Sequence, residues 1–167
     1  MSKPIELDEL IGQIHAAPVQ LVLAITGGGS RVIPELLERP GGSRTVLAAI
    51  VPYSSAALGD LLQAMPEQYC SARTARLMAM AAYQRALRLA SGGLESASGG
   101  QKSPDHVALP YETRYIGLGC TASLASDRPK RGDHRIHVAY QTRDTTAEFS
   151  LVLAKGQRTR LEEEIID

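Results

Sequence analysis

Short uninterrupted apolar runs alternate with amphipathic segments along the first half of the chain. Residues 19–25 (VQLVLAI) and 45–51 (TVLAAIV) are such runs, and because they are too short for independent helices they predict buried strands. Apolar positions at helical spacing predict one helix from Leu7 to about Ala17 and another over residues 32–37. The pattern therefore indicates helices and buried strands in alternation.

A longer amphipathic helix is predicted over residues 71–89. One face of it carries small and apolar residues, namely Ala75, Met78, Ala79, Ala82, Ala86 and Leu89. Its polar positions include the arginines at 73, 76, 85 and 88. The alanines predict close packing of this face against a neighbouring element. A shorter helix before it, capped by Ser54 or Ser55, is predicted to run to Gln63.

The second half of the chain has a different pattern. Residues 91–105 are rich in glycine and serine and predict a mobile loop. Residues 114–121 predict a third strand, residues 134–142 and 146–154 predict a β-hairpin, and residues 161–166 predict a last helix. The predicted fold class is therefore α/β, a mixed sheet covered by helices on both faces in three α/β/α layers.

Length and composition narrow the class of protein. The 167 residues are enough for one compact domain, and we expect a single domain over residues 1–167. Eighteen basic residues balance eighteen acidic ones, which removes the electrostatic reason for binding a nucleic acid polymer or an anionic membrane. Neither a secretory signal nor a membrane-spanning run is visible, so a cytoplasmic location is predicted.

The spacing of cysteine and histidine does not favour a metal site. Cys70 and Cys120 each stand alone, without the C-x-x-C spacing of metal and redox sites. His134 and His137 are three residues apart on a predicted strand, which directs their side chains to opposite faces. We therefore expect two buried, reduced thiols, no metal and no cofactor.

A glycine-rich turn lies between the first predicted strand and the helix that follows it. The turn reads Thr26-Gly27-Gly28-Gly29-Ser30, and backbone amides at the start of a helix can hold an anionic group. The turn matches neither the dinucleotide fingerprint nor the P-loop pattern. The alternative interpretation is a tight turn in which Ser30 caps the helix.

A basic cluster lies in the polar stretch before the predicted hairpin. Arg128, Lys130, Arg131 and Arg135 fall within eight positions, so this stretch is a candidate for contacting an anionic ligand. The alternative is a solvated loop, because free surface arginines cost little.

Hydroxyl side chains are the candidate nucleophiles. Thr26, Ser30, Ser54, Ser55 and Thr121 all carry one. A hydroxyl needs an adjacent base to become a nucleophile, and the sequence identifies none. Residues of this kind are more often cap or turn residues.

The order of these segments resembles the C-terminal domain of the CinA family, whose active members are nicotinamide-nucleotide amidases. The resemblance spans most of the chain and rests on the segments LAITGGGSRVIPELLERPGGS, IVPYSSAAL and LGCTASLASDRPKRGDHRIHVAY, together with the alanine-rich helix. It places Gly28 and Gly29 on the paired glycines of the family, Tyr53 and Ser54 on its Tyr-Ser pair, and Ala122 on the alanine of a later loop.

Departures from the family pattern fall at the residues that would carry the chemistry. Ile25 takes the place of the nucleophilic serine that the resemblance implies, Ala24 that of the preceding glutamate, and Leu58 that of the lysine. An isoleucine has no nucleophilic atom and a leucine cannot accept a proton. A shift of one residue would instead align Thr26 with the nucleophile, or let Ser30 act from the start of the helix.

Three hypotheses follow. The first is a CinA-like domain that no longer hydrolyses amides and either binds a small anionic ligand, such as a pyridine or other mononucleotide, or acts as a scaffold. The second is an active nicotinamide mononucleotide deamidase, or another hydrolase, with displaced catalytic residues, for which Thr26, Ser30, Tyr53 and Ser54 are candidates. The third is a homo-oligomerisation module that docks through the small-residue face of helix 71–89. The expected ligand-binding residues are Gly27, Gly28, Gly29, Ser30, Tyr53, Ser54, Thr121, Arg128 and Arg131.

Overall fold

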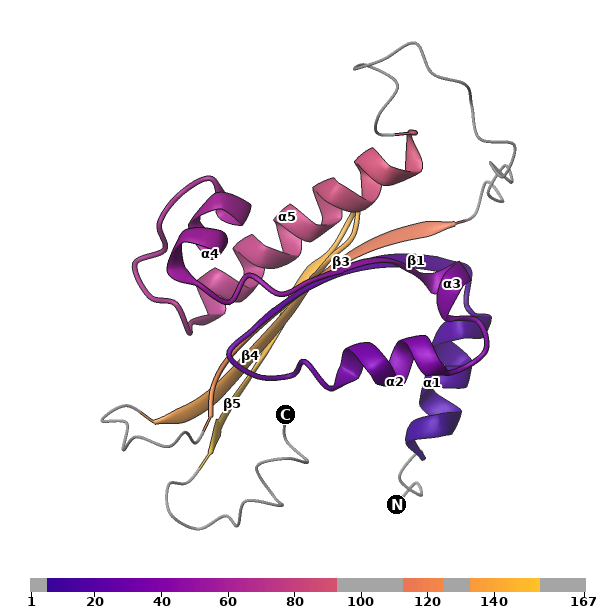
Figure 1. Cartoon of the computed structure of the whole chain (residues 1–167), viewed down its shortest axis with the longest axis horizontal. Helices are drawn as coiled ribbons and strands as arrows, with labels where there is room; N and C mark the ends of the chain where they lie inside the picture. Colours follow the sequence, from indigo (N-terminus) through magenta and orange to yellow (C-terminus); the bar gives the residue numbers. More distant parts are fainter. Residues whose placement is uncertain (1–5, 93–112, 125–132, 154–167) are drawn as a thin grey trace.

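The structure, a computed structural model, describes residues 6–92, 113–124 and 133–153 (Figure 1). Its helices are α1 (Leu7–Ala16), α2 (Val32–Glu38), α3 (Gly42–Thr45), α4 (Ser55–Leu62) and α5 (Ala72–Ala90). Its strands are β1 (Val19–Thr26), β2 (Val46–Ile50), β3 (Arg114–Ser123), β4 (His134–Gln141) and β5 (Thr146–Leu153). The predicted alternation of helices and strands, followed by a hairpin, is confirmed.

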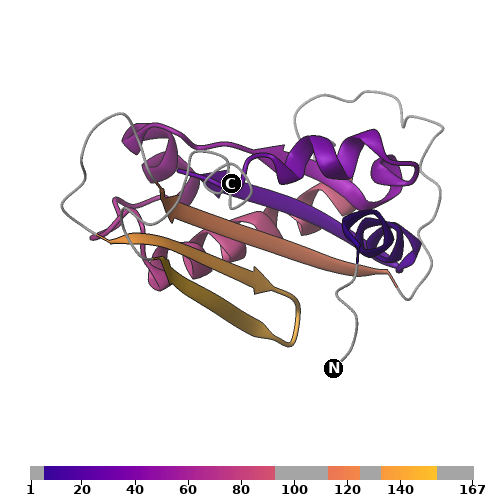
Figure 2. The same ribbon diagram turned by 90° about the horizontal axis from the view of Figure 1, so that it is seen from below.

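The strands form one sheet in the order β2-β1-β3-β4-β5. β1 runs parallel to both of its neighbours, β2 and β3, whereas β4 and β5 are added antiparallel. The sheet is therefore mixed. Parallel strands need crossover connections, which here are helical, so helices cover the parallel part of the sheet on both faces (Figure 2).

Alternation along β1 separates the two layers of helix. Leu21, Leu23 and Ile25 share one core cluster with Ile11 of α1 and Leu36 of α2. Val22 and Ala24 point the other way, into a second cluster with Leu58 of α4 and with Met78, Ala82 and Ala86 of α5. The predicted α/β/α layering is confirmed, with α1 to α3 on one face and α4 and α5 on the other.

The long helix packs unusually close to β3. A side chain added at Gly117 would place its Cβ 2.1 Å from the Ala79 carbonyl oxygen, and one at Gly119 would lie 2.3 Å from the Ala75 carbonyl oxygen. Only glycine fits at these two positions, because the helix backbone occupies the space of a Cβ atom. The predicted close approach of the alanine face is thus confirmed. Its partner is β3, so this face is not available for docking a second copy, and the basis of our oligomerisation hypothesis is wrong.

Several local predictions need correction. Thr45 belongs to the short helix α3 rather than to β2. β2 is only half-buried, because it is an edge strand. Leu7 and Leu10, expected to pack inward, are 52% and 42% exposed, and Leu89 is 38% exposed. Helical spacing alone does not show how much of a helix the sheet covers, and these side chains lie outside the covered arc.

Polar groups fix the ends of the helices. Ser54 accepts a hydrogen bond from the Ala57 amide at the start of α4, and Ser71 accepts one from the Thr74 amide at the start of α5. The predicted serine cap of the shorter helix is confirmed at Ser54. His15 is buried where α1 meets α3: its Nε2 lies 2.9 Å from the Leu36 carbonyl oxygen and its Nδ1 3.0 Å from Thr45 Oγ1.

Some predicted elements lie outside the described residues. These are the loop predicted over residues 91–105, of which only 91 and 92 are described, and the helix predicted over residues 161–166. Among the helices of the described ranges, none combines the length and the apolar character needed to cross a membrane.

Candidate functional site

The parallel strands end at one edge of the sheet, where the chain leaves neighbouring strands in opposite directions. After β1 it turns toward α2 on one face, and after β2 it turns toward α4 on the other (Figure 1). In open α/β sheets such a switch in direction leaves a crevice at the carboxyl ends of the strands, where ligands bind. The topology therefore points to the region around Thr26 and Val51.

Two cavities occupy this edge. The larger, of about 250 Å³, lies on the α4 and α5 side and is lined by Thr26, Gly27, Pro52, Tyr53, Ser54, Ser55, Leu58, Tyr69, Cys70, Thr121 and Ala122. The smaller, of about 160 Å³, is lined by Ile25, Thr26, Gly27, Gly28, Ser30, Val51 and Tyr53. Thr26, Gly27 and Tyr53 line both cavities, so the two adjoin.

Most of the ligand-binding residues expected from the sequence meet here. Gly27 and Tyr53 line both cavities, Ser54 and Thr121 line the larger, and Gly28 and Ser30 line the smaller. Gly29 is in the same turn but lines neither cavity. Arg128 and Arg131 lie outside the described residues.

Gly27 determines the shape of the turn that separates the two cavities. Its φ of 78° is in the left-handed region that favours glycine. A Cβ atom at this position would stand only 2.0 Å from the Ala122 carbonyl oxygen. The turn after β1 can therefore lie against the end of β3 only because residue 27 has no side chain.

The start of α2 differs from the anion site that the sequence predicts. The helix has only seven residues, and no side chain caps it. The amides of Val32 and Ile33 already donate to the carbonyl oxygens of Gly29 and Ser30, at 3.3 and 3.1 Å. Ser30 is thus not a side-chain cap, and these two amides are not free to bind a ligand.

The hydroxyl groups around the larger cavity hold the loops of the site together. Thr26 Oγ1 donates to the Pro52 carbonyl oxygen at 3.1 Å, which ties the end of β1 to the loop after β2. Thr121 Oγ1 donates to the Tyr69 carbonyl oxygen at 2.9 Å, which ties β3 to the segment before α5. A carbonyl oxygen is not a base, so these contacts position the backbone and do not activate a nucleophile.

The expected correspondence of Ile25 and Leu58 with a catalytic pair is wrong. A nucleophile and its base must be within hydrogen-bonding reach of each other. Ile25 and Leu58, however, belong to core clusters on opposite faces of the sheet. Thr26 is the β1 residue that lines the same cavity as Leu58. Strand alternation therefore favours the register shifted by one residue, in which Thr26 faces the position of the lysine.

Two residues that line the larger cavity come from a segment that the sequence does not connect with the site. Tyr69 and Cys70 immediately precede the Ser71 cap of α5 and line the larger cavity. The signal that could identify them is the topology of the sheet. The connection from β2 to the parallel strand β3 begins at the carboxyl edge, so the residues that precede α5 in this connection lie near the site. Tyr53 and Tyr69 are 82% and 48% exposed, and they offer two aromatic surfaces at the rim.

The cavities contain little that can transfer a proton. The residues that line them within the described ranges include no aspartate, glutamate, histidine, lysine or arginine. Among the described lining residues, the titratable side chains are the tyrosine phenols and the Cys70 thiol, which lies 3.8 Å from the Thr121 carbonyl oxygen. Across the described ranges, no group of three or more His, Cys, Asp and Glu side chains is placed to hold a metal ion.

The mixed sheet between two layers of helix makes this chain an α/β/α domain. Comparisons with known proteins identify the fold more closely. No protein-family model and no curated protein sequence matches the chain. The competence/damage inducible protein CihA from Agrobacterium tumefaciens superposes with a TM-score of 0.62 at 19% identity, over 99% of this chain and 91% of that one.

Two CinA superfamily proteins match in the same way. Those from Escherichia coli and Enterobacter cloacae have TM-scores of 0.61 and 0.60 at 12% and 14% identity. Each alignment covers 92% of this chain, and 81% and 82% of theirs. The chain therefore has the CinA fold, and the resemblance stated from the sequence is confirmed at the level of the fold.

Proposed function

We propose that this chain is a CinA-like domain that binds a small anionic ligand, such as a pyridine or other mononucleotide, in the two cavities and does not hydrolyse it. We also propose a cytoplasmic location. The observation that carries the proposal is the larger cavity: its position at the carboxyl edge suits a ligand, while none of its described walls offers an activated nucleophile.

The aromatic rim supports a planar ring as one part of the ligand. Tyr53 and Tyr69 line the same cavity and both are exposed. Tyrosine rings bind flat aromatic groups through stacking and apolar contact. The turn from Gly27 to Ser30 lies beside them and offers backbone that a charged group can approach closely, since glycine has no side chain to block it.

The positions of the hydroxyl groups support the proposed absence of hydrolysis. Thr26 is the β1 hydroxyl residue that lines the cavity with Leu58, yet its hydroxyl donates a hydrogen bond to the Pro52 carbonyl oxygen, and Leu58 cannot accept a proton from it. Leu58 is 2% exposed and packs with Val22 and Met78. A general base would have to replace part of this apolar cluster.

Calorimetry with nicotinamide mononucleotide tests binding. Heat of binding is expected with the intact protein, and Tyr53→Ala is expected to abolish it, whereas Tyr53→Phe should retain it because the ring remains. Phe149→Ala is the matched control, since Phe149 is a 64% exposed aromatic residue on β5 that lines neither cavity. If no heat is detected at millimolar ligand, this ligand class is excluded and a scaffold role remains.

Ammonia release from the same nucleotide tests the second hypothesis, an active deamidase. We expect none above the blank for the intact protein or for Thr26→Val, which keeps the shape of the side chain and removes its hydroxyl. Turnover by the intact protein that disappears in Thr26→Val would show that Thr26 is a nucleophile, and it would refute the proposed loss of catalysis.

A further inference from the structure

The outward side of α5 carries an apolar stripe at coiled-coil spacing. Leu77, Met80, Gln84 and Leu87 are separated by three, four and three residues, the spacing by which one helix packs along another. The three apolar members are 44%, 39% and 41% exposed. We call these four residues the outer face of α5. It is distinct from the alanine face, which packs against β3.

A groove adjoins the outer face at the start of the helix. It has a volume of about 320 Å³ and lies between the end of α4 and the first turns of α5. Leu62, Met65, Pro66 and Leu77 form its apolar lining, and Met65 is 62% exposed. Leu77 belongs to both features, so the groove and the outer face form one continuous surface.

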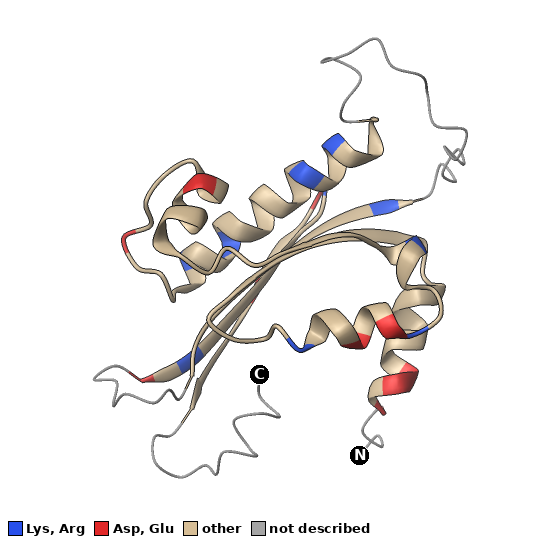
Figure 3. Ribbon diagram, in the orientation of Figure 1, with Lys and Arg blue, Asp and Glu red and all other residues tan. Residues whose placement is uncertain are grey.

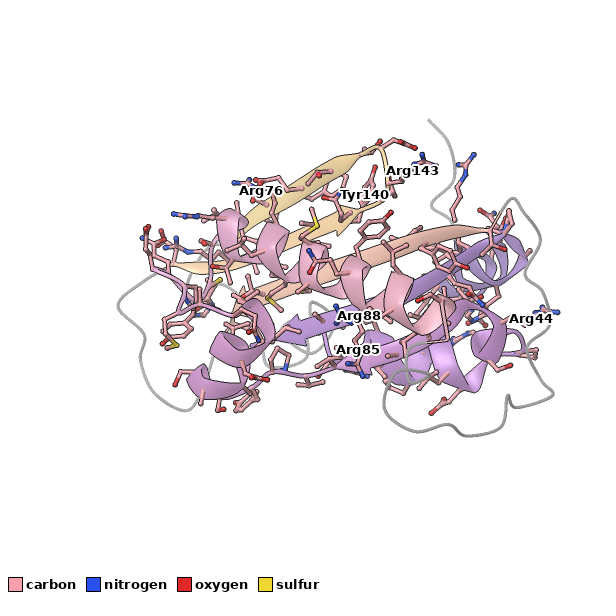
Figure 4. The ribbon with its side chains drawn as sticks, turned by 90° about the horizontal axis from the view of Figure 1, so that it is seen from above. Arg44, Arg76, Arg85, Arg88, Tyr140 and Arg143 are labelled. Atoms are coloured by element: carbon pink, nitrogen blue, oxygen red, sulfur yellow. The ribbon has the colours of Figure 1, made fainter. Side chains whose placement is uncertain are left out.

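The charged residues of α5 all have one sign, whereas the groove is also lined by the acidic residue Glu67. Figure 3 shows basic residues on α5 and no acidic ones, and the sequence of the helix has arginine at 73, 76, 85 and 88. Arg73 pairs with Glu67, and Arg76 pairs with Glu148. Within the described part of the chain, neither Arg85 nor Arg88 forms an ion pair. Figure 4 shows these two side chains near each other on the flank of α5 away from Arg76.

We propose that the outer face of α5, together with the adjoining groove, docks an acidic amphipathic helix of a partner protein. Apolar side chains of the partner would pack on Leu77, Met80 and Leu87, and its carboxylates would pair with Arg85 and Arg88. An amphipathic helix that lays its apolar side into a groove is a recurrent mode of recognition. Charge complementarity favours an acidic partner over a neutral or basic one.

The same charges argue against a second copy as the occupant. Two α5 helices packed face to face would bring arginines of like sign together with no acidic residue on either helix. Like charges at a contact disfavour that pairing. A partner with glutamate or aspartate on the flanks of its apolar stripe has no such penalty.

Fluorescence anisotropy with two synthetic helices tests the proposal. Both probes are labelled peptides of about three heptads with leucine at a and d, and they carry either glutamate or lysine at e and g. The glutamate peptide is expected to bind, and more weakly as salt is raised, because ions screen exposed charges. The lysine peptide is expected to bind at least about tenfold more weakly.

A pair of charge-reversed proteins locates the contact. The variant Arg85→Glu/Arg88→Glu is expected to bind the glutamate peptide at least about tenfold more weakly than the unmodified protein does, and to bind the lysine peptide more tightly. Arg44→Glu/Arg143→Glu changes the net charge equally at exposed sites away from α5 (Figure 4), and it should change affinity less than about twofold. Circular dichroism verifies that each variant is folded.

Three results would overturn the proposal. The first is equal binding of the two peptides, and the second is no binding of the glutamate peptide at about millimolar concentration. The third is a dimer in sedimentation that Leu77→Glu dissociates, which would show that a second copy occupies the outer face.

Discussion

Replacing Gly119 by alanine tests the close packing of α5 on β3. The added Cβ would lie 2.3 Å from the Ala75 carbonyl oxygen and 2.6 Å from the Ala79 amide nitrogen. Both are backbone atoms, so no side chain can rotate away. An ordinary contact begins at 3.4 Å, so the helix must move outward by at least about 1 Å, which is an overpacking defect.

The expected cost is at the upper end of the range for overpacking, about 3 kcal/mol. For a domain of this size, that cost lowers the melting temperature by about 6–12 °C. Urea unfolding followed by circular dichroism gives the free energy of unfolding, and calorimetry gives the melting temperature. The same movement would displace Tyr69 and Cys70, which directly precede the helix, so ligand binding is expected to weaken as well.

The same substitution at Gly12 is the matched control. Gly12 is exposed inside α1, and nothing lies within 4 Å of an added Cβ. Alanine there is expected to stabilise the protein by about 0.5–1 kcal/mol, because it reduces the freedom of the unfolded chain. The reasoning is refuted if Gly119→Ala costs less than about 1 kcal/mol, or if the two substitutions act in the same direction.

Three further predictions concern substitutions of single residues. Burial, followed by the charge of Arg135, lowers the pKa of His137 below 6.5. Because the unfolded chain then binds a proton more readily than the folded one, the free energy of unfolding should be level above about pH 7.5 and fall as the pH drops through 6.5. Urea titrations at several pH values should show this fall, and a smaller one in His137→Gln. Ser54→Ala removes the cap of α4 and should cost about 1 kcal/mol in the same assay, whereas an unchanged midpoint would mean that solvent satisfies the Ala57 amide equally well. Gly27→Ala combines a positive φ with a contact to the Ala122 carbonyl oxygen, so it should destabilise the fold by more than about 2 kcal/mol and abolish nucleotide binding in calorimetry. A variant that keeps both its stability and its nucleotide binding would contradict the described turn.

The fold was largely predictable because its strongest signals are periodic. β1 is apolar at every position from Leu21 to Ile25 because helices cover both of its faces, and the alternation in β4 and β5 marks a hairpin. The edge position of β2 was not predictable, because a run of apolar residues does not show how many neighbours a strand has. For the same reason the exposure of Leu7 and Leu10 could not be read from the spacing of α1.

The candidate site was predictable only in part. The turn after β1 and the Tyr53-Ser54 pair stand out in the sequence as glycine and cap signals. Tyr69 and Cys70 carry no local signal and reach the site through the crossover from β2 to β3. The register at the end of β1 needed the structure, because consecutive glycines permit an alignment to slide by one residue, whereas strand alternation assigns each side chain to one face.

The hydrogen bond from Thr26 to Pro52 limits how a single substitution could turn the Thr26 hydroxyl into a nucleophile. A basic side chain introduced at position 58 alone would compete with the Pro52 carbonyl oxygen for the hydrogen bond that the Thr26 hydroxyl donates, and it would also disturb an apolar cluster. Removing the threonine hydroxyl would instead release the end of β1 from the loop after β2 without creating a reactive group. A catalytic threonine at this position would therefore require at least two coordinated replacements.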